Sequence, residues 1–224
     1  AADLSRDGQW LAYMRMSDRP ARMSVFVRDL KGGATHQLSN SATLPSLLLA
    51  PVDWATRLTA WSRSGPDVLY FVDQPDVGMI RRYRAGEESA GPPLAKAADD
   101  KVYFRDLDVS PVTGRLGFLS AGAHGVILQE LDPVTGAVRD IATFAPKENA
   151  VRTIGRGWLG RHFGLLRSTR IYEDSTADLE ILIVNDSGTA RVAGHITRAF
   201  AATARLHLPR RALYLTRVDK GTHN

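Results

Sequence analysis

The sequence predicts an all-β protein, a β-propeller built from four-stranded antiparallel blades. Three observations carry this prediction: a unit that recurs along the chain, strand-like composition in every copy, and turn-forming residues between the strands. The chain has 224 residues, of which 44% are hydrophobic and 24% charged. This composition is ordinary for a globular protein that buries a sizeable core.

The recurring unit starts with an apolar residue, a serine and a glycine turn, written LSRDG in the first copy. The second position of each copy falls at Ser5, Ser62, Ser110, Leu159 and His207, which are 57, 48, 49 and 48 residues apart. A unit of this length holds about three or four antiparallel strands, the content of one propeller blade. A single blade cannot bury both its faces, but blades packed face to face bury each other. A β-sandwich is the alternative, and it does not require the turn to recur at a constant period.

The repeats predict a single propeller domain, or a fragment of one, over residues 1–224. The expected blades span 1–45, 54–100, 101–147, 150–198 and 199–224, the last incomplete. About four and a half blades do not close a ring. Because an unclosed ring leaves open sheet edges, we expect the chain to be part of a longer protein or a larger assembly.

Within a copy, short apolar runs alternate with turn chemistry. In the first copy Trp10 to Met14 and Val25 to Leu30 read as strands, and the sequences KGG, DPVTG and NDSG later supply the glycines that tight hairpin turns need. No segment has a helical period with caps at both ends. The strand aromatics are expected to pack between blades: Tyr13, Tyr70, Phe71, Phe118 and Tyr214.

The first copy, SRDGQWLAYMR followed by VFVRDLKGGATHQLS, resembles the TolB-type, WD40-like (PD40) repeat. Ser110-Pro111 with Gly114, and Leu131-Asp132 with Gly136, repeat the pattern, and about half the chain matches it closely. The repeat is also similar to the propellers of prolyl-oligopeptidase-family peptidases. Membership in this repeat family would imply a ring of six to eight blades. The resemblance supports a fold more strongly than a function.

Charge and hydropathy exclude several classes of protein. The net charge of +5 is spread along the chain rather than gathered into a stripe, so we expect no nucleic-acid partner. No apolar stretch is long enough to span a membrane, since the longest run, LPSLLLAPV, is broken by two prolines. We expect a periplasmic or extracytoplasmic location in a bacterium, with a cytoplasmic one as the alternative.

Motifs for catalysis, metals and cofactors are missing from this sequence. It has no cysteine, no G-x-S-x-G elbow and no paired histidine spacing, so we expect no catalytic residues, no metal site and no cofactor. GRGWLG, at 155–160, has the G-x-G-x-x-G spacing of a dinucleotide loop. The residues after it, RHFGLLR, are strand-like, and a phosphate-binding loop needs a helix there. We interpret GRGWLG as a degenerate copy of the turn written SRDG in the first repeat.

The loops between the second and third strands of each blade should emerge on one face of a propeller, together with the connections between blades. Arginines, acids and apolar residues gather in these loops, a mixture typical of protein-binding surfaces. The candidate partner-binding residues are Arg19, Arg22, Leu47, Leu48, Trp54, Asp73, Asp76, His124, Arg167, Arg170, Tyr172 and Lys220.

We therefore expect a non-enzymatic propeller that binds a protein or peptide or acts as a scaffold. One alternative is a propeller that gates a prolyl-oligopeptidase-like serine hydrolase whose catalytic domain lies outside this chain. Another is the sensor domain of a membrane-anchored or DNA-binding regulator. An active site assembled from single residues of several blades would leave no sequence signal.

Overall fold

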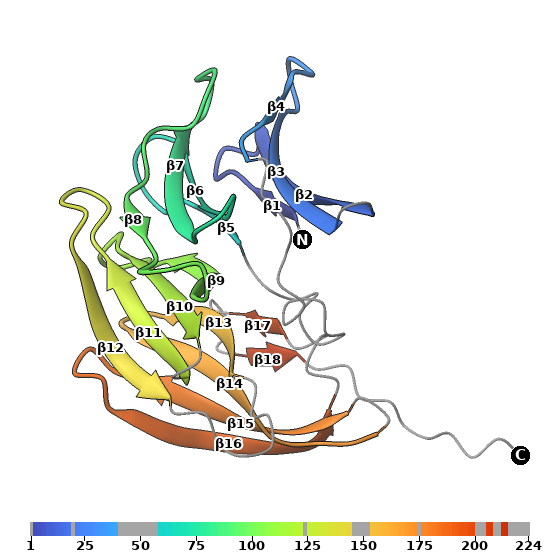
Figure 1. Cartoon of the computed structure of the whole chain (residues 1–224). Coiled ribbons are helices and arrows are strands. Elements are labelled where there is room, and N and C mark those ends of the chain that lie inside the picture. The colour runs from blue at the N-terminus through green and yellow to red at the C-terminus, as the bar shows by residue number, and fades with distance from the viewer. Residues whose placement is uncertain are drawn as a thin grey trace, which may run out of the picture.

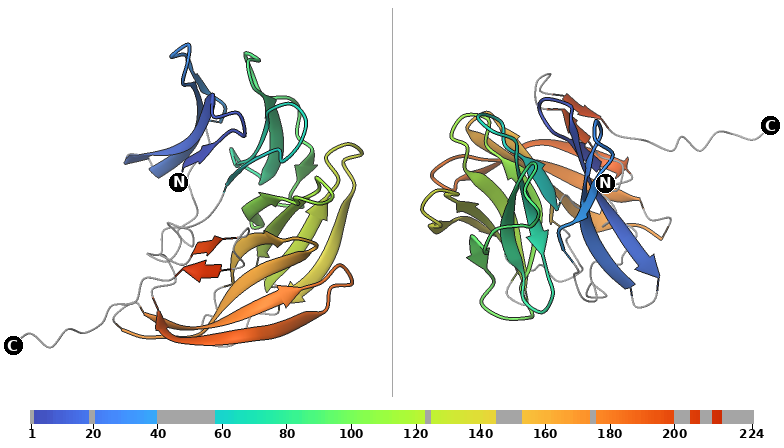
Figure 2. Two further views of the ribbon diagram at one scale, coloured as in Figure 1. Left: turned by 180° about the vertical axis from the view of Figure 1, so that it is seen from behind. Right: turned by 90° about the horizontal axis from the view of Figure 1, so that it is seen from above.

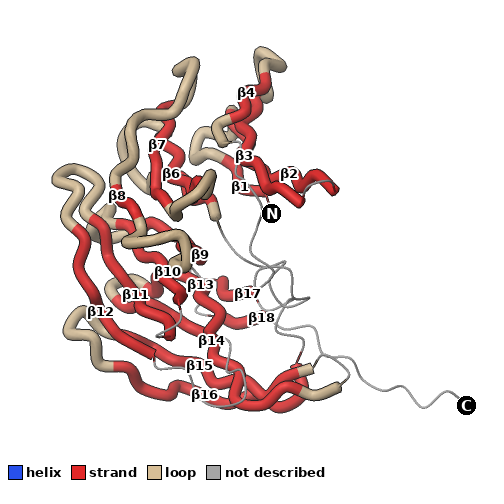
Figure 3. Tube along the Cα trace, in the orientation of Figure 1, coloured by secondary structure: helices blue, strands red, loops and turns tan. Residues whose placement is uncertain are grey.

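The computed structural model describes residues 2–18, 21–39, 58–122, 125–144, 153–173, 176–199, 205–207 and 212–214. Over these residues the chain consists of β-strands joined by turns and loops (Figure 3). Four antiparallel sheets of four strands follow one another along the chain, and two short strands form one further pair (Figure 1). The all-β prediction is confirmed. Within these ranges there is no helix of the length and apolarity needed to cross a bilayer.

The strands of the first sheet are β1 (Ala2–Leu4), β2 (Trp10–Asp18), β3 (Ala21–Asp29) and β4 (Thr35–Gln37). The second sheet contains β5 (Thr59–Trp61), β6 (Val68–Asp73), β7 (Met79–Arg84) and β8 (Ala95–Lys96). The third contains β9 (Tyr103–Val109), β10 (Leu116–Gly122), β11 (Gly125–Leu131) and β12 (Val138–Phe144). The fourth contains β13 (Thr153–Leu159), β14 (His162–Ile171), β15 (Ala177–Val184) and β16 (Ala190–Ala199). The last pair is β17 (Arg205–His207) and β18 (Ala212–Tyr214).

Each four-stranded sheet keeps its strands in sequence order, so the chain runs from an inner to an outer strand before it enters the next sheet. The inner strands β1, β5, β9 and β13 contact one another in succession. The outer strands β4, β8, β12 and β16 lie at the periphery, and the four sheets form an open arc (Figures 1 and 2). Because all four sheets have the same strand order, their equivalent turns lie on the same face of the arc.

The recurring serine closes the turn after the inner strand. The backbone N–H of Ser5 donates to the Trp10 carbonyl at 2.8 Å, and that of Ser110 donates to the Arg115 carbonyl at 2.8 Å. The Ser5 hydroxyl oxygen also accepts the Trp10 N–H at 2.9 Å. Ser62 makes the same backbone bond, to Val68, at 2.7 Å. The repeat therefore recurs because a short side chain with an oxygen satisfies turn N–H groups that have no partner in the sheet.

Hydrophobic cores fill the spaces between consecutive sheets. Between the first two sheets, Val27 and Leu69 are fully buried, and between the second and third, Ile80 and Phe118 are. Between the third and fourth sheets, Leu119 and Leu128 pack against residues of the fourth sheet: Trp158, Phe163, Leu165, Leu182 and Val184. Each sheet thus buries a face against its neighbour, as stacked blades must.

The aromatic residues expected between blades divide into two groups. Phe71 and Phe118 are fully buried, and Phe118 packs edge-on against Phe104 with ring centroids 4.9 Å apart. Tyr70 is partly buried against the core between the second and third sheets. Tyr13 instead stacks on its cross-strand partner Phe26, with centroids 5.5 Å apart, and both rings are half-buried. The side chain of Tyr214 lies outside the described residues.

Candidate functional site

The G-x-G-x-x-G stretch forms strand β13 and the turn into β14. Gly157 has a φ of 115°, and Gly160 has a φ of 64° at the turn. The register of β13 against β14 shifts between Gly155 and Gly157. A strand, His162–Ile171, follows where a phosphate-binding loop would need a helix N-terminus. The interpretation of GRGWLG as a turn between strands agrees with this geometry.

Gly157 makes room for a carboxylate of the protein itself. A Cβ atom at Gly157 would clash with the carboxylate of Asp108 on β9. That carboxylate is completely buried, and its Oδ2 accepts the backbone N–H of Trp158 at 3.0 Å. Its Oδ1 accepts a hydrogen bond from Arg63 Nη2, also at 3.0 Å. Because Arg63 follows β5, Asp108 links the second, third and fourth sheets near the inner strands.

Several of the predicted partner-binding residues lie outside the part of the chain whose side chains the structure describes. Arg22 belongs to β3, but its side chain is not described. The others lie outside the described residues: Arg19, Leu47, Leu48, Trp54, His124 and Lys220. Their part in a binding surface stays a prediction.

The two predicted acids of the second sheet differ in their surroundings. Asp73, at the end of β6, is only 4% exposed, and its Oδ2 accepts a hydrogen bond from Arg81 Nη1 at 3.2 Å. This ion pair joins β6 to β7. Asp76 lies in the β6–β7 connection and is exposed. Of the two, Asp76 is the side chain within reach of a partner.

Of the remaining predicted residues, Arg170 and Tyr172 come together at the end of the β14–β15 hairpin, whereas Arg167 lies within β14 and pairs elsewhere. The guanidinium carbon of Arg170 lies 4.8 Å from the centroid of the Tyr172 ring. Arg198, on β16, places its guanidinium carbon 4.4 Å from the same centroid. Because β14 and β16 flank β15, the two arginines reach Tyr172 from both sides of the central strand. We call Arg170, Tyr172, Asp178 and Arg198 the arginine–tyrosine cluster.

Asp178 on β15 holds this cluster in place. Its Oδ1 accepts the backbone N–H of Arg198 at 3.0 Å, and its Oδ2 accepts the Tyr172 hydroxyl at 2.8 Å. These two bonds, from Arg198 first and then Tyr172, lower the pKa of Asp178 below its ordinary value, and the nearby positive charges of Arg170 and Arg198 add to the effect. Arg198 has a φ of 48°, a left-handed conformation that non-glycine residues rarely adopt and that the hydrogen bond from its N–H to Asp178 helps to maintain.

Arg167 lies on β14, before Arg170 in the chain, and forms an ion pair with Glu180 on β15. Its Nε donates to Glu180 Oε2 at 2.9 Å, and Glu180 Oε1 lies 3.9 Å from His195 Nδ1. Sequence reasoning found Arg167, Arg170 and Tyr172, but it missed Asp178, Glu180 and Arg198. The missing signal is the pairing of β15 with β14 and β16, which includes register shifts on both sides.

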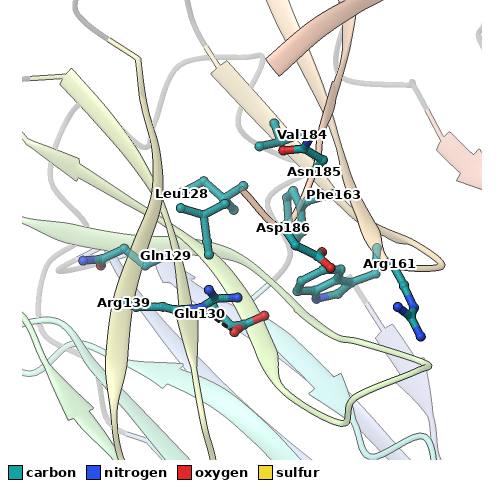
Figure 4. A pocket seen from close by; sticks show the side chains of 11 residues that line it. Leu128, Gln129, Glu130, Arg139, Arg161, Phe163, Val184, Asn185 and Asp186 are labelled. Carbon is teal, nitrogen blue, oxygen red and sulfur yellow. Dashed lines mark hydrogen bonds and ion pairs between the residues drawn. The ribbon is translucent and has the colours of Figure 1, made fainter. Parts of the chain in front are cut away.

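A small hollow with a volume of about 10 Å³ lies between the third and fourth sheets (Figure 4). Leu128 and Phe163 contribute apolar surface, and the charged side chains of Glu130 and Arg139 lie across from Arg161 and Asp186. Glu130 Oε1 accepts hydrogen bonds from both Arg115 and Arg139 at 2.8 Å, so its buried carboxylate is neutralised within the sheet. The volume of the hollow is about the space that one water molecule requires, whereas small-molecule pockets are commonly about 300–1,000 Å³, so the hollow is not a site for such a ligand. Among the described residues, no group of three or more histidines and acids is placed to hold a metal ion.

The repeated four-stranded sheets, their shared inner edge and the cores between them define a β-propeller architecture. No model of a protein family and no curated protein sequence matches this chain. Solved structures do match. TolB from Acinetobacter baumannii superposes with a TM-score of 0.52 at 15% identity, over 85% of this chain and 41% of TolB.

Two further solved structures extend the comparison. A TolB-type protein from Agrobacterium tumefaciens gives a TM-score of 0.59 at 12% identity, over 96% of this chain and 72% of that one. The β-propeller domain of the Trilobed protease from Pyrococcus furiosus, which has an open Velcro topology, gives 0.53 at 14% identity, over 92% and 59%. The chain thus spans less than two thirds of two of these three proteins. The predicted likeness to TolB and peptidase propellers is confirmed at the level of the fold.

Proposed function

We propose that this chain is a non-enzymatic binding module, in which propeller blades hold loops that recognise a protein or peptide. The arginine–tyrosine cluster carries the proposal. The sequence placed Arg170 and Tyr172 together in one loop of such a surface, and the guanidinium carbon of Arg170 lies 4.8 Å from the centroid of the Tyr172 ring. Their position at the end of the β14–β15 hairpin corresponds to that of Asp76 in the β6–β7 connection of the second sheet.

The geometry of the cluster suits an anchor for a partner. Arginine and tyrosine are enriched among the residues that dominate binding energy at protein interfaces. The Tyr172 ring is held by its hydroxyl bond to Asp178 and by two guanidinium groups that lie over it, so little side-chain freedom is left to lose on binding. Arg170 is exposed, and its guanidinium group carries several N–H donors for a partner acceptor.

Site-specific photo-crosslinking in cells that produce the full protein tests this proposal. A crosslinking amino acid is placed at Asp76 or Glu173, both exposed at the proposed binding end. The control positions are Thr113 and Val134, which are exposed in the turns at the opposite end of the third sheet. We expect a defined crosslinked partner only from the first pair, and we expect Arg170→Ala with Tyr172→Ala to abolish it. Equal crosslinking from both ends, or a partner unaffected by the double substitution, contradicts the proposal.

The likeness to the TolB proteins supports an extracytoplasmic, periplasmic location as part of the same proposal. Fusion of the full reading frame to a reporter that is active only outside the cytoplasm checks it. A cytoplasmic signal contradicts it.

The likeness to a peptidase propeller supports a second candidate function, that of a propeller gating substrate access to a separate serine hydrolase domain. The two functions differ in what the full reading frame must encode. The hydrolase requires an α/β domain with a nucleophile elbow, and activity against short peptides that a substitution of its serine removes. A sensor domain, the third candidate, requires a transmembrane or DNA-binding segment instead.

A further inference from the structure

Every sheet after the first has a leading face, which we define as the face that points toward the preceding sheet. The second strand of each sheet supplies two apolar side chains to this face, and all of them are at most 1% exposed: Leu69 and Phe71, Leu116 and Phe118, and Phe163 and Leu165. On the inner strands, Trp61, Val109 and Trp158 pair with the first residue of each two and are at most 6% exposed. The preceding sheet therefore covers the leading face in all three cases.

The first sheet has an equivalent leading face, and none of the described sheets covers it (Figure 1). On β2, Leu11 and Tyr13 occupy the positions of these apolar pairs, and Leu4 of β1 pairs with Leu11. Ala12, between them, points to the opposite face and into the core with the second sheet. Leu4 is 52% exposed, and Tyr13 and its stacked partner Phe26 are half-buried. The first sheet thus presents an apolar face of the kind that the other sheets bury.

Two arginines distinguish this face from the others. Arg28 pairs with Leu11 across β2 and β3, and its side chain is exposed. The corresponding residues of the later sheets are aromatic or aliphatic and at most 1% exposed: Tyr83, Leu131 and Val184. Arg15, two residues after Tyr13, lies on the same face and is also exposed. The registers of β1 to β4 place no acidic residue on this face.

Charged residues on the leading faces of the later sheets are paired within their own sheet. Asp73 and Arg167 occupy the position of Arg15, and they form ion pairs with Arg81 and Glu180 respectively. Among the described residues, no acid forms an ion pair with either arginine of the first sheet. Burying a cation under an apolar sheet costs free energy unless a partner neutralises it. A sheet that covers this face therefore has to supply carboxylates.

The fourth sheet of a second copy does not meet this requirement. Its far face, which points away from the third sheet, takes its side chains from β14 and β15: Leu166, Ser168, Leu179, Ile181 and Ile183. Arg191 of β16 pairs with Ile183, so this face brings a further arginine, and β14 and β15 bring no acid to it. Two copies that packed through their first sheets would likewise bring arginines together.

We propose that a further sheet of the same polypeptide covers the leading face of the first sheet, with an apolar centre and with carboxylates opposite Arg15 and Arg28. The same polypeptide supplies the covering sheet in all three described cases, and we assign the fourth to it as well. The carboxylates make the contact selective, because a sheet without them would leave two arginines buried and unpaired. This surface lies between blades, and it goes beyond the loop-end surface of the proposed function.

Photo-crosslinking within the protein made from the full reading frame tests for the covering sheet. A crosslinking amino acid replaces Leu4, and the matched control is Leu30, which is 49% exposed in the turn after β3. Mass spectrometry identifies the joined peptides, and gel mobility shows whether they belong to one chain. We expect Leu4 to be joined to an acid-containing segment outside residues 1–224 of its own chain, and Leu30 not to be joined to it. Arg170→Ala with Tyr172→Ala should leave this crosslink unchanged, which separates the result from the proposed function.

Charge reversal in the full protein tests for the carboxylates. Arg28→Glu should lower the midpoint of thermal unfolding by about 5 °C or more, because it places like charges face to face. Lysine in place of the acid in the crosslinked segment should then restore the midpoint, since it re-forms an opposite pair. Arg82→Glu, at an exposed arginine on β7, the third strand of the second sheet, is the matched control and should change the midpoint by about 2 °C or less.

Any of the following results overturns the proposal. A crosslinked species with the mass of two chains identifies a second copy as the occupant, and one that contains another protein identifies a separate partner. No crosslink from Leu4, or the same crosslinks from Leu4 and Leu30, shows that no sheet covers the face. An unchanged midpoint for Arg28→Glu, or a lowered midpoint that lysine does not restore, shows that carboxylates do not select the covering sheet.

Discussion

Replacing Gly157 with alanine perturbs the point where the third and fourth sheets meet. The alanine Cβ would clash with the carboxylate of Asp108, which is fully buried and holds the Trp158 N–H. The residue would also have to keep a φ of 115°, which L-residues with a side chain rarely adopt. Either the backbone of β13 changes, or the Asp108 carboxylate leaves its place.

The expected loss of unfolding free energy has two contributions, backbone strain at residue 157 and the lost hydrogen bond between Asp108 and the Trp158 N–H. Backbone strain at such a position costs about 1–3 kcal/mol. Loss of a buried hydrogen bond to a charged group costs about 1.5–3 kcal/mol. We therefore expect Gly157→Ala to lower the free energy of unfolding by about 2.5–6 kcal/mol. For a domain whose total stability is about 5–15 kcal/mol, this is a large loss.

Gly160 provides a matched control three residues away in the same motif. Its φ of 64° is also positive, but a Cβ there would meet nothing within 4 Å. Gly160→Ala should cost only the left-handed strain, about 1–2 kcal/mol. Urea unfolding monitored by tryptophan fluorescence measures both variants. In an Asp108→Ala background the clash with the carboxylate is gone and only a tight contact to the Cβ of residue 108, at 3.1 Å, remains, so the cost of Gly157→Ala should fall toward that of strain alone. Equal losses for Gly157→Ala and Gly160→Ala in the parent protein would refute the reasoning.

Two further predictions concern the core and the arginine–tyrosine cluster. Phe118→Ala should cost about 3–5 kcal/mol in thermal or urea unfolding, because it empties a fully buried site, whereas Val134→Ala, at a position 90% exposed, should stay within about 0.5 kcal/mol. The lowered pKa of Asp178 means that its contribution to stability is present above the ordinary aspartate pKa and is lost as the pH falls through its folded value. Tyr172→Phe removes one of the bonds to this carboxylate, so an NMR titration should show its pKa moving up toward the ordinary value; an unchanged pKa would show that the hydroxyl bond is absent in solution.

The serine turns, the hairpin glycines and the alternation of apolar residues could all be read from the sequence. The turn at Ser5 closes through atoms of residues no more than five positions away, and the Gly33 turn is made within Asp29–Ala34. Such local geometry depends on the residues that form it, so it recurs wherever they recur. For the same reason the strand-like residues that directly follow GRGWLG argued against a nucleotide loop without any knowledge of the other sheets.

The contacts between distant strands could not be read in this way. Nothing in the sequence places Asp108 against Gly157, 49 residues further on, or Arg198 against Tyr172. The first contact depends on how two sheets pack. The second depends on register shifts in β15 and its partners, each of which moves every later side chain relative to its neighbour. Turns and strands are thus determined by the sequence of this protein, whereas only the tertiary structure decides which charged groups meet, because register and sheet packing are properties of the whole chain.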